Sequence, residues 1–163
     1  MREWRSNQDD VNGGAARDQG TRDARPPVAP VSSATAELLA RSDAELVAAT
    51  LASDAGEILV HAHLAALRAG AALVQARGRP GGRPAPRSVW DMVGVLAPGL
   101  ARWASFFADN AATRAAVESG RGHVVAPERA EQTLAAAEDF QDAVRAELGL
   151  AGAPQGRLVL RAS

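Results

Sequence analysis

The chain has 163 residues, with 18 basic and 19 acidic side chains and a formal net charge of −1. This length fits one ordinary domain with tails, and the charge balance argues against a chain that binds DNA or lipid through its overall charge. The absence of cysteine excludes disulfides and thiolate metal sites, and it suits a reducing compartment such as the cytoplasm. No secretory signal is evident, and no run of about 18 uninterrupted apolar residues predicts a membrane span.

The N-terminal segment, residues 1–31, is polar and rich in Gly, Pro and mixed charge, with few large apolar side chains. Such a segment buries too little apolar surface to offset the entropy lost on ordering. We predict a disordered N-terminal tail, with a partner-binding arm as the alternative. One helical domain over residues 32–149 and a C-terminal tail over residues 150–163 are expected to follow.

Two helices are expected in the first half of this domain. The first begins near Ser33, with Ser33 or Thr35 as its cap. Its larger apolar residues return at helical spacing, namely Leu38, Leu39, Leu46, Val47 and Leu51. The second follows Asp54, which has capping-box spacing to Glu57. Its core face is predicted to consist of Leu64, Leu67, Ala71 and Val74.

An arginine-rich loop, residues 77–88, ends the second helix, because Pro and Gly disfavour its continuation. The loop carries four arginines and no acid: Arg77, Arg79, Arg83 and Arg87. A plain linker is the simplest interpretation. These side chains are also suited to contact the phosphates of RNA or DNA. The "RGRP" sequence within the loop is typical of segments that enter the narrow minor groove of AT-rich DNA.

The second half of the domain is expected to contain the aromatic core and the last helix. Ser88 caps a helix with Asp91 three residues on, and Pro98 kinks this helix or begins a new segment. The last helix runs from Pro127 to about Leu148. Its predicted stripe is Ala130, Leu134, Ala137, Val144 and Leu148. Since no strand pattern is evident, the sequence predicts an all-α fold, an antiparallel bundle of four to five helices.

Metal and cofactor sites are not expected. His61 and His63 point in nearly opposite directions on a helix, so they cannot chelate one ion, and one of them is expected to be packed while the other lies at the surface. The acidic residues Glu138, Asp139 and Asp142 are interpreted as the solvated face of the last helix, with Gln141 and Arg145 beside them. Paired carboxylates and histidines are the usual metal ligands and proton carriers in proteins, so these residues are the candidates for such a site.

A possible ribonuclease site lies around the last interhelical loop. Arg114, Arg121 and His123 flank this loop. An arginine that stabilises a phosphate, beside a histidine that moves protons, is sufficient for RNA cleavage without a metal. A solvated loop histidine is the alternative interpretation.

Three stretches, "AHLAALRAGAALV", "RSVWDMVGVLAPGLARWASFFA" and "AEDFQDAV", resemble an uncharacterised family of HEPN-domain proteins from high-GC bacteria of the actinobacterial type. The resemblance covers roughly residues 35–149, and its strongest matches are the segment 63–68 together with Trp90, Pro98, Trp103 and Phe107. It implies a helical bundle that forms homodimers. It also implies one of two roles, a metal-independent ribonuclease or a toxin paired with a nucleotidyltransferase-like antitoxin.

The active HEPN proteins carry an arginine, four to six residues, and then a histidine. Here eight residues separate Arg114 from His123, and one separates Arg121 from His123, so catalytic roles are not carried over and an enzyme is not favoured. We expect a cytoplasmic, non-catalytic module that binds nucleic acid or a protein partner in stress, defence or DNA repair, with His63 and Arg68 lining any polar notch. The alternatives are a ribonuclease that uses His123 with Arg114 or Arg121 across a dimer, and a structural subunit whose partner covers the face around Trp90.

Overall fold

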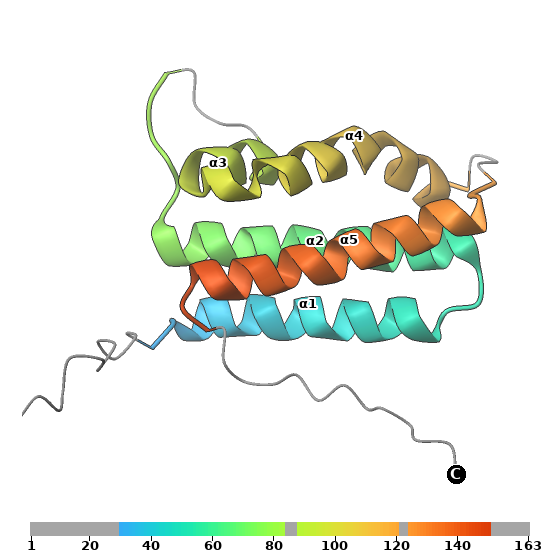
Figure 1. Ribbon diagram of the computed structural model, residues 1–163, viewed down its shortest axis with the longest axis horizontal. Coiled ribbons are helices and arrows are strands. Elements are labelled where there is room, and N and C mark those ends of the chain that lie inside the picture. Colours follow the sequence, from blue (N-terminus) through green and yellow to red (C-terminus); the bar gives the residue numbers. More distant parts are fainter. Residues whose placement is uncertain (1–29, 84–87, 121–123, 151–163) are drawn as a thin grey trace, which may run out of the picture.

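The computed structural model describes residues 30–83, 88–120 and 124–150, and these residues form helices and connections without a strand (Figure 1). The elements are α1 (Ser33–Leu51), α2 (Ala55–Arg77), α3 (Val89–Leu96), the short 3-10 helix η1 (Pro98–Leu100), α4 (Ala101–Glu118) and α5 (Pro127–Glu147). The prediction of an all-α fold is confirmed. Nearly all of the two predicted tails lies outside the described residues.

Side-chain caps fix where three of the helices begin. Ser88 and Asp91 form the complete capping box predicted for α3, with bonds of 3.0 and 3.1 Å. Asp54 accepts a hydrogen bond from the Glu57 amide at 3.0 Å at the start of α2. The predicted cap of α1 is wrong by one residue or more, because Ser32 accepts from the Thr35 amide. The Thr35 side chain is instead buried within the first turn.

Helix α2 is the central element, since it packs against α1, α3, α4 and α5. In Figure 1, α5 crosses in front of α2, with α1 below and α3 and α4 above. The core face of α2 consists largely of alanines, namely Ala62, Ala65, Ala66, Ala69 and Ala72, with Leu59 and Leu73 near its two ends. Of the predicted core face, Leu67 is partly buried and packs against the core cluster, whereas Leu64, Ala71 and Val74 are partly buried and lie outside that cluster. A helix with four neighbours presents small side chains to them, since small side chains permit close approach.

The approach of α3 to α2 leaves no room for a side chain at Gly70. A methyl group added at Gly70 would lie 2.8 Å from the Val89 side chain and 3.3 Å from that of Val93. Since α3 cannot approach as closely over a larger residue, Gly70 sets the distance between these helices.

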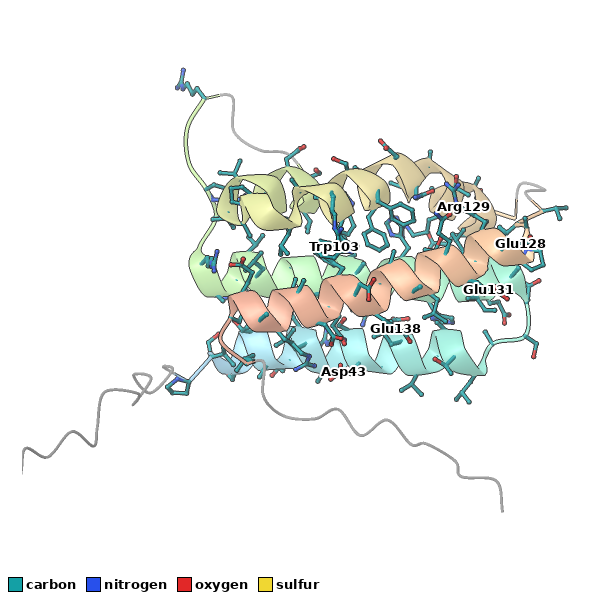
Figure 2. All side chains as sticks on the ribbon, viewed as in Figure 1. Asp43, Trp103, Glu128, Arg129, Glu131 and Glu138 are labelled. Carbon is teal, nitrogen blue, oxygen red and sulfur yellow. The ribbon has the colours of Figure 1, made fainter. Side chains whose placement is uncertain are left out.

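An aromatic cluster fills the space between α2, α3, α4 and α5. The rings of Trp90 and Phe107 are stacked with centroids 5.2 Å apart, and Phe140 lies 5.9 Å from Phe107. Trp103 lies between α4 and α5, as Figure 2 shows, with its ring centroid 6.3 Å from that of Phe140. Pro98 begins a new segment, η1, as predicted. This change of direction brings residues on both sides of Pro98 into the same core.

A polar seam joins α1 to α5. Gln141 donates hydrogen bonds to Ser42 Oγ at 3.0 Å and to an Asp43 carboxylate oxygen at 2.8 Å. Arg145 donates to both oxygens of Asp43 at 2.8 Å. Gln141 and Arg145 therefore face α1, which corrects their placement on the solvated face of the last helix. The predicted solvated residues, Glu138, Asp139 and Asp142, are exposed.

Candidate nucleic-acid interface

Arg77, the last residue of α2, anchors the root of the arginine-rich loop. Its guanidinium donates to the carbonyl of Leu96 at 2.8 Å and to the carbonyl of Glu147 at 3.0 Å. A third bond of 2.6 Å runs to the Glu147 carboxylate. These carbonyls lie at the C-terminal ends of α3 and α5, where a cation is favourable because of the helix dipoles. Arg77 therefore joins three helix ends.

The loop then leaves the bundle through two glycines with positive φ. Gly78 has φ +82° and Gly82 has φ +116°, backbone conformations that side-chain-bearing residues rarely adopt. Figure 1 shows the segment after α2 extending away from the helices. Arg79 and Arg83 are exposed on this segment, and neither guanidinium forms an ion pair or hydrogen bond with a described residue. Arg87 lies outside the described residues.

The predicted ribonuclease residues are only partly described. Arg114 lies on α4 and forms an ion pair of 3.0 Å with Glu118 one turn further on. Its Nε atom is buried and has no hydrogen-bond partner among the described atoms. Arg121 and His123 lie outside the described residues, between the end of α4 and the start of α5.

Two polar residues near this end of the bundle, Asn110 and Arg129, were not predicted from the sequence. The Arg129 guanidinium on α5 donates to the side-chain oxygen of Asn110 on α4, and the Asn110 amide donates to the Phe106 carbonyl at 2.7 Å. Asn110 is buried. Its position three residues after Phe107, within the apolar face of α4, is the signal that could have identified it.

His63 and Arg68 lie in different surroundings. His63 is buried against the edges of Trp90 and Phe107, and its Nε2–H donates to the Phe107 carbonyl at 3.0 Å. Burial lowers the pKa of this imidazole, and its Nδ1 has no described partner. Arg68 pairs with Glu45 of α1 at 2.9 Å near the surface.

His61 is the surface histidine of the pair, and its Nδ1 lies 2.7 Å from the other Glu45 oxygen. One histidine is thus packed and hydrogen-bonded while the other lies near the surface, as predicted. In the described ranges, no group of three His, Asp or Glu side chains is placed to hold a metal ion.

Two further surfaces bear on the partners of this protein. Trp90 is only 7% exposed, so it offers little surface for the partner that one interpretation places over it. Helix α2 is long and apolar enough to cross a membrane, with a mean hydropathy of 1.3 over its most apolar 18 residues, and half of that stretch is buried inside the bundle. Such burial is the pattern of a core helix.

A family model described as SAV_6107-like HEPN matches residues 49–145, from the end of α1 to the last turn of α5. The match covers more than half of the chain. This chain belongs to the HEPN family. The matched residues include the aromatic core, the α2–α3 loop and the α4–α5 connection. The arginine-rich loop and the predicted ribonuclease residues therefore both belong to the HEPN domain. No curated protein and no solved structure matches the chain.

Proposed function

We propose that this HEPN domain is a non-catalytic module that binds nucleic acid through its α2–α3 loop. In this proposal the fold is an antiparallel bundle of four to five helices, and two copies form a homodimer. The protein acts in the cytoplasm of a high-GC bacterium, in stress, defence or DNA repair. The observation that carries it is a pair of exposed, unpaired arginines on a loop whose root is fixed by Arg77.

The loop arginines have different roles in this proposal. Arg77 is engaged with Glu147 and two helix ends, so it positions the loop. Arg79 and Arg83 are free to contact phosphates, and Arg87 extends the same basic run in sequence. Counterions released by such contacts supply most of the affinity in sequence-independent binding. A plain linker would need no such charge.

The contacts of Arg114 and His63 support a non-catalytic role. The Arg114 guanidinium is paired with Glu118, and His63 is enclosed in the core. The spacing of Arg114 and Arg121 to His123 also departs from that of the active HEPN proteins. A ribonuclease that uses His123 is the alternative, and it has a direct test.

The binding test uses labelled single-stranded RNA and an AT-rich DNA duplex across a salt series. The variant Arg79→Gln/Arg83→Gln removes two loop charges, and Arg41→Gln/Arg102→Gln removes two exposed charges on α1 and α4. If two phosphate contacts are lost, the slope of log affinity against log salt on duplex DNA falls by about 1.8 for the loop variant. The control variant keeps most of the slope.

Three outcomes would contradict the proposal. Equal weakening by both variants would show a general charge effect without a loop site, and no binding of either nucleic acid would remove the function. RNA cleavage that is lost in His123→Ala would replace the binding module by a ribonuclease.

A further inference from the structure

A hollow of about 450 Å³ lies at the root of the arginine-rich loop, between α1, α2 and α3. Its apolar wall consists of Leu38 from α1, Val74 from α2, and Val89 and Met92 from the first turn of α3. Sites for small organic groups in proteins have volumes of roughly 300–1,000 Å³ and are mostly apolar. The hollow therefore has the size and the wall of a site for one such group.

Two polar side chains, Gln75 and Arg79, line the same hollow. Gln75 lies in the last turn of α2, and its exposed carboxamide forms no hydrogen bond with a described residue. Arg79 follows Gly78, whose φ of +82° turns the chain at the end of the helix. None of the described residues that line the hollow is acidic. The hollow thus combines an apolar wall, an amide and a cation without a described counterion.

We propose that this hollow holds one unstacked base of a single-stranded nucleic acid while Arg79 contacts the phosphate beside that base. The inference rests on the proposed function and names the class of nucleic acid that the loop binds. A nucleotide unit joins a flat ring to an anion, and it matches each part of the site. The wall contacts the faces of the base, and the carboxamide of Gln75, which carries a donor and an acceptor, pairs with its edge.

The hollow favours single strands over duplexes. In a duplex each base is stacked and paired, so it enters a pocket only after it leaves the stack, which costs free energy. A single strand presents bases that are already unpaired. The loop charges alone contact the phosphates of either form. An aliphatic side chain of a protein partner would fill the hollow but leave the amide of Gln75 and the guanidinium of Arg79 desolvated and unpaired.

Filling the hollow tests the inference directly. Ala71 lines the hollow from α2, so Ala71→Phe occupies the space of the base and leaves the loop charges in place. Ala112→Phe adds the same ring at an exposed position on α4 and is the matched control. The parent chain should bind a single-stranded DNA or RNA oligonucleotide about tenfold more tightly than the duplex of the same sequence. Ala71→Phe should abolish this preference without weakening the binding of the duplex, and Ala112→Phe should keep the preference.

A fluorescent base and a second variant report on the hollow independently. The fluorescence of 2-aminopurine within an oligonucleotide is quenched by its stacked neighbours, so it should rise when the base enters the aliphatic wall in the parent chain but not in Ala71→Phe. Gln75→Leu removes an exposed amide and should weaken single-strand binding by about fivefold through the loss of a hydrogen bond. Binding of the duplex by Gln75→Leu should not change. Helical circular dichroism at the parent level shows that each variant is folded.

The outcomes separate this inference from the proposed function. Binding of the duplex that equals or exceeds binding of the single strand by the parent chain overturns the base site and leaves the loop as a phosphate-binding element. A folded Ala71→Phe that keeps the single-strand preference has the same meaning. Adenosine monophosphate that competes at the concentration of the oligonucleotide would replace the strand by a free nucleotide. Failure of the parent chain to bind either nucleic acid removes the proposed function and this inference together.

Discussion

The buried imidazole of His63 predicts a specific dependence of stability on pH. Burial is the main cause that lowers its pKa in the folded protein below the usual 6.5, and nearby Arg114 lowers it further. The Phe107 carbonyl and Glu118 act in the opposite direction and do not overcome burial. Between the lowered pKa of folded His63 and 6.5, this imidazole binds a proton in the unfolded chain but not in the folded protein. The free energy of unfolding therefore rises with pH over this range. The contribution of neutral His63 to the free energy of unfolding is complete above about pH 6.5 and is lost as the pH falls from there toward the lowered pKa of the folded protein.

The magnitude follows from one proton on one residue. Between the unfolded pKa and the lowered folded pKa, the free energy of unfolding decreases by at most about 1.4 kcal/mol per pH unit. Urea unfolding of the protein at intervals from pH 7.5 to 5.0 measures this slope. His63→Gln keeps a side-chain amide that is able to donate to the Phe107 carbonyl and removes the titration, so its slope should be smaller over this range.

His61→Gln is the matched control, because His61 lies at the surface beside Glu45. The His61→Gln variant should keep the part of the pH dependence of the unfolding free energy that His63 contributes. An unchanged slope in His63→Gln, or loss of the slope in His61→Gln alone, would refute the assignment of the pH dependence to the buried histidine.

Three further substitutions test the core, the polar seam and a cap by urea unfolding. Phe107→Ala should lower the free energy of unfolding by about 3–5 kcal/mol, since the ring is fully buried in the aromatic cluster; a loss below about 1 kcal/mol would contradict that packing. Asp43→Ala should cost about 1–2 kcal/mol, because it leaves Arg145 without its carboxylate acceptor and Gln141 with Ser42 alone, whereas exposed Asp139→Ala should change stability by less than about 0.5 kcal/mol. Ser88→Ala should cost about 1 kcal/mol through loss of the α3 cap, and Ser88→Asp should restore most of it.

Local signals in the sequence predicted the helix boundaries well, because caps and prolines act through neighbouring residues. Ser88, Pro98 and Pro127 each mark a helix start in the structure. The core face of α2 was not predictable by the same reasoning. Periodicity assigns the larger side chains to the core, and only the number of neighbours around α2 explains why alanines are buried there instead.

The candidate interface shows the same division between local and distant information. The basic run from Arg77 to Arg87 is plain in the sequence. The distinct role of Arg77 is not, because its partners Leu96 and Glu147 lie 19 and 70 residues further along the chain. Gln141 likewise has the pattern of a surface residue in the sequence, because its partner Ser42 on α1 lies 99 residues earlier in the chain.

The bonds of Arg77 have a consequence for how this protein can diversify. Arg77 holds the ends of α2, α3 and α5 together at the residue where the loop begins. A change in the length or charge of the loop should therefore leave the packing of these helices unchanged. In the proposed function, insertions and substitutions after Gly78 should therefore change nucleic-acid binding while the melting temperature of the protein stays nearly constant. The length and charge of the loop can then change without compensating changes in the interior of the bundle.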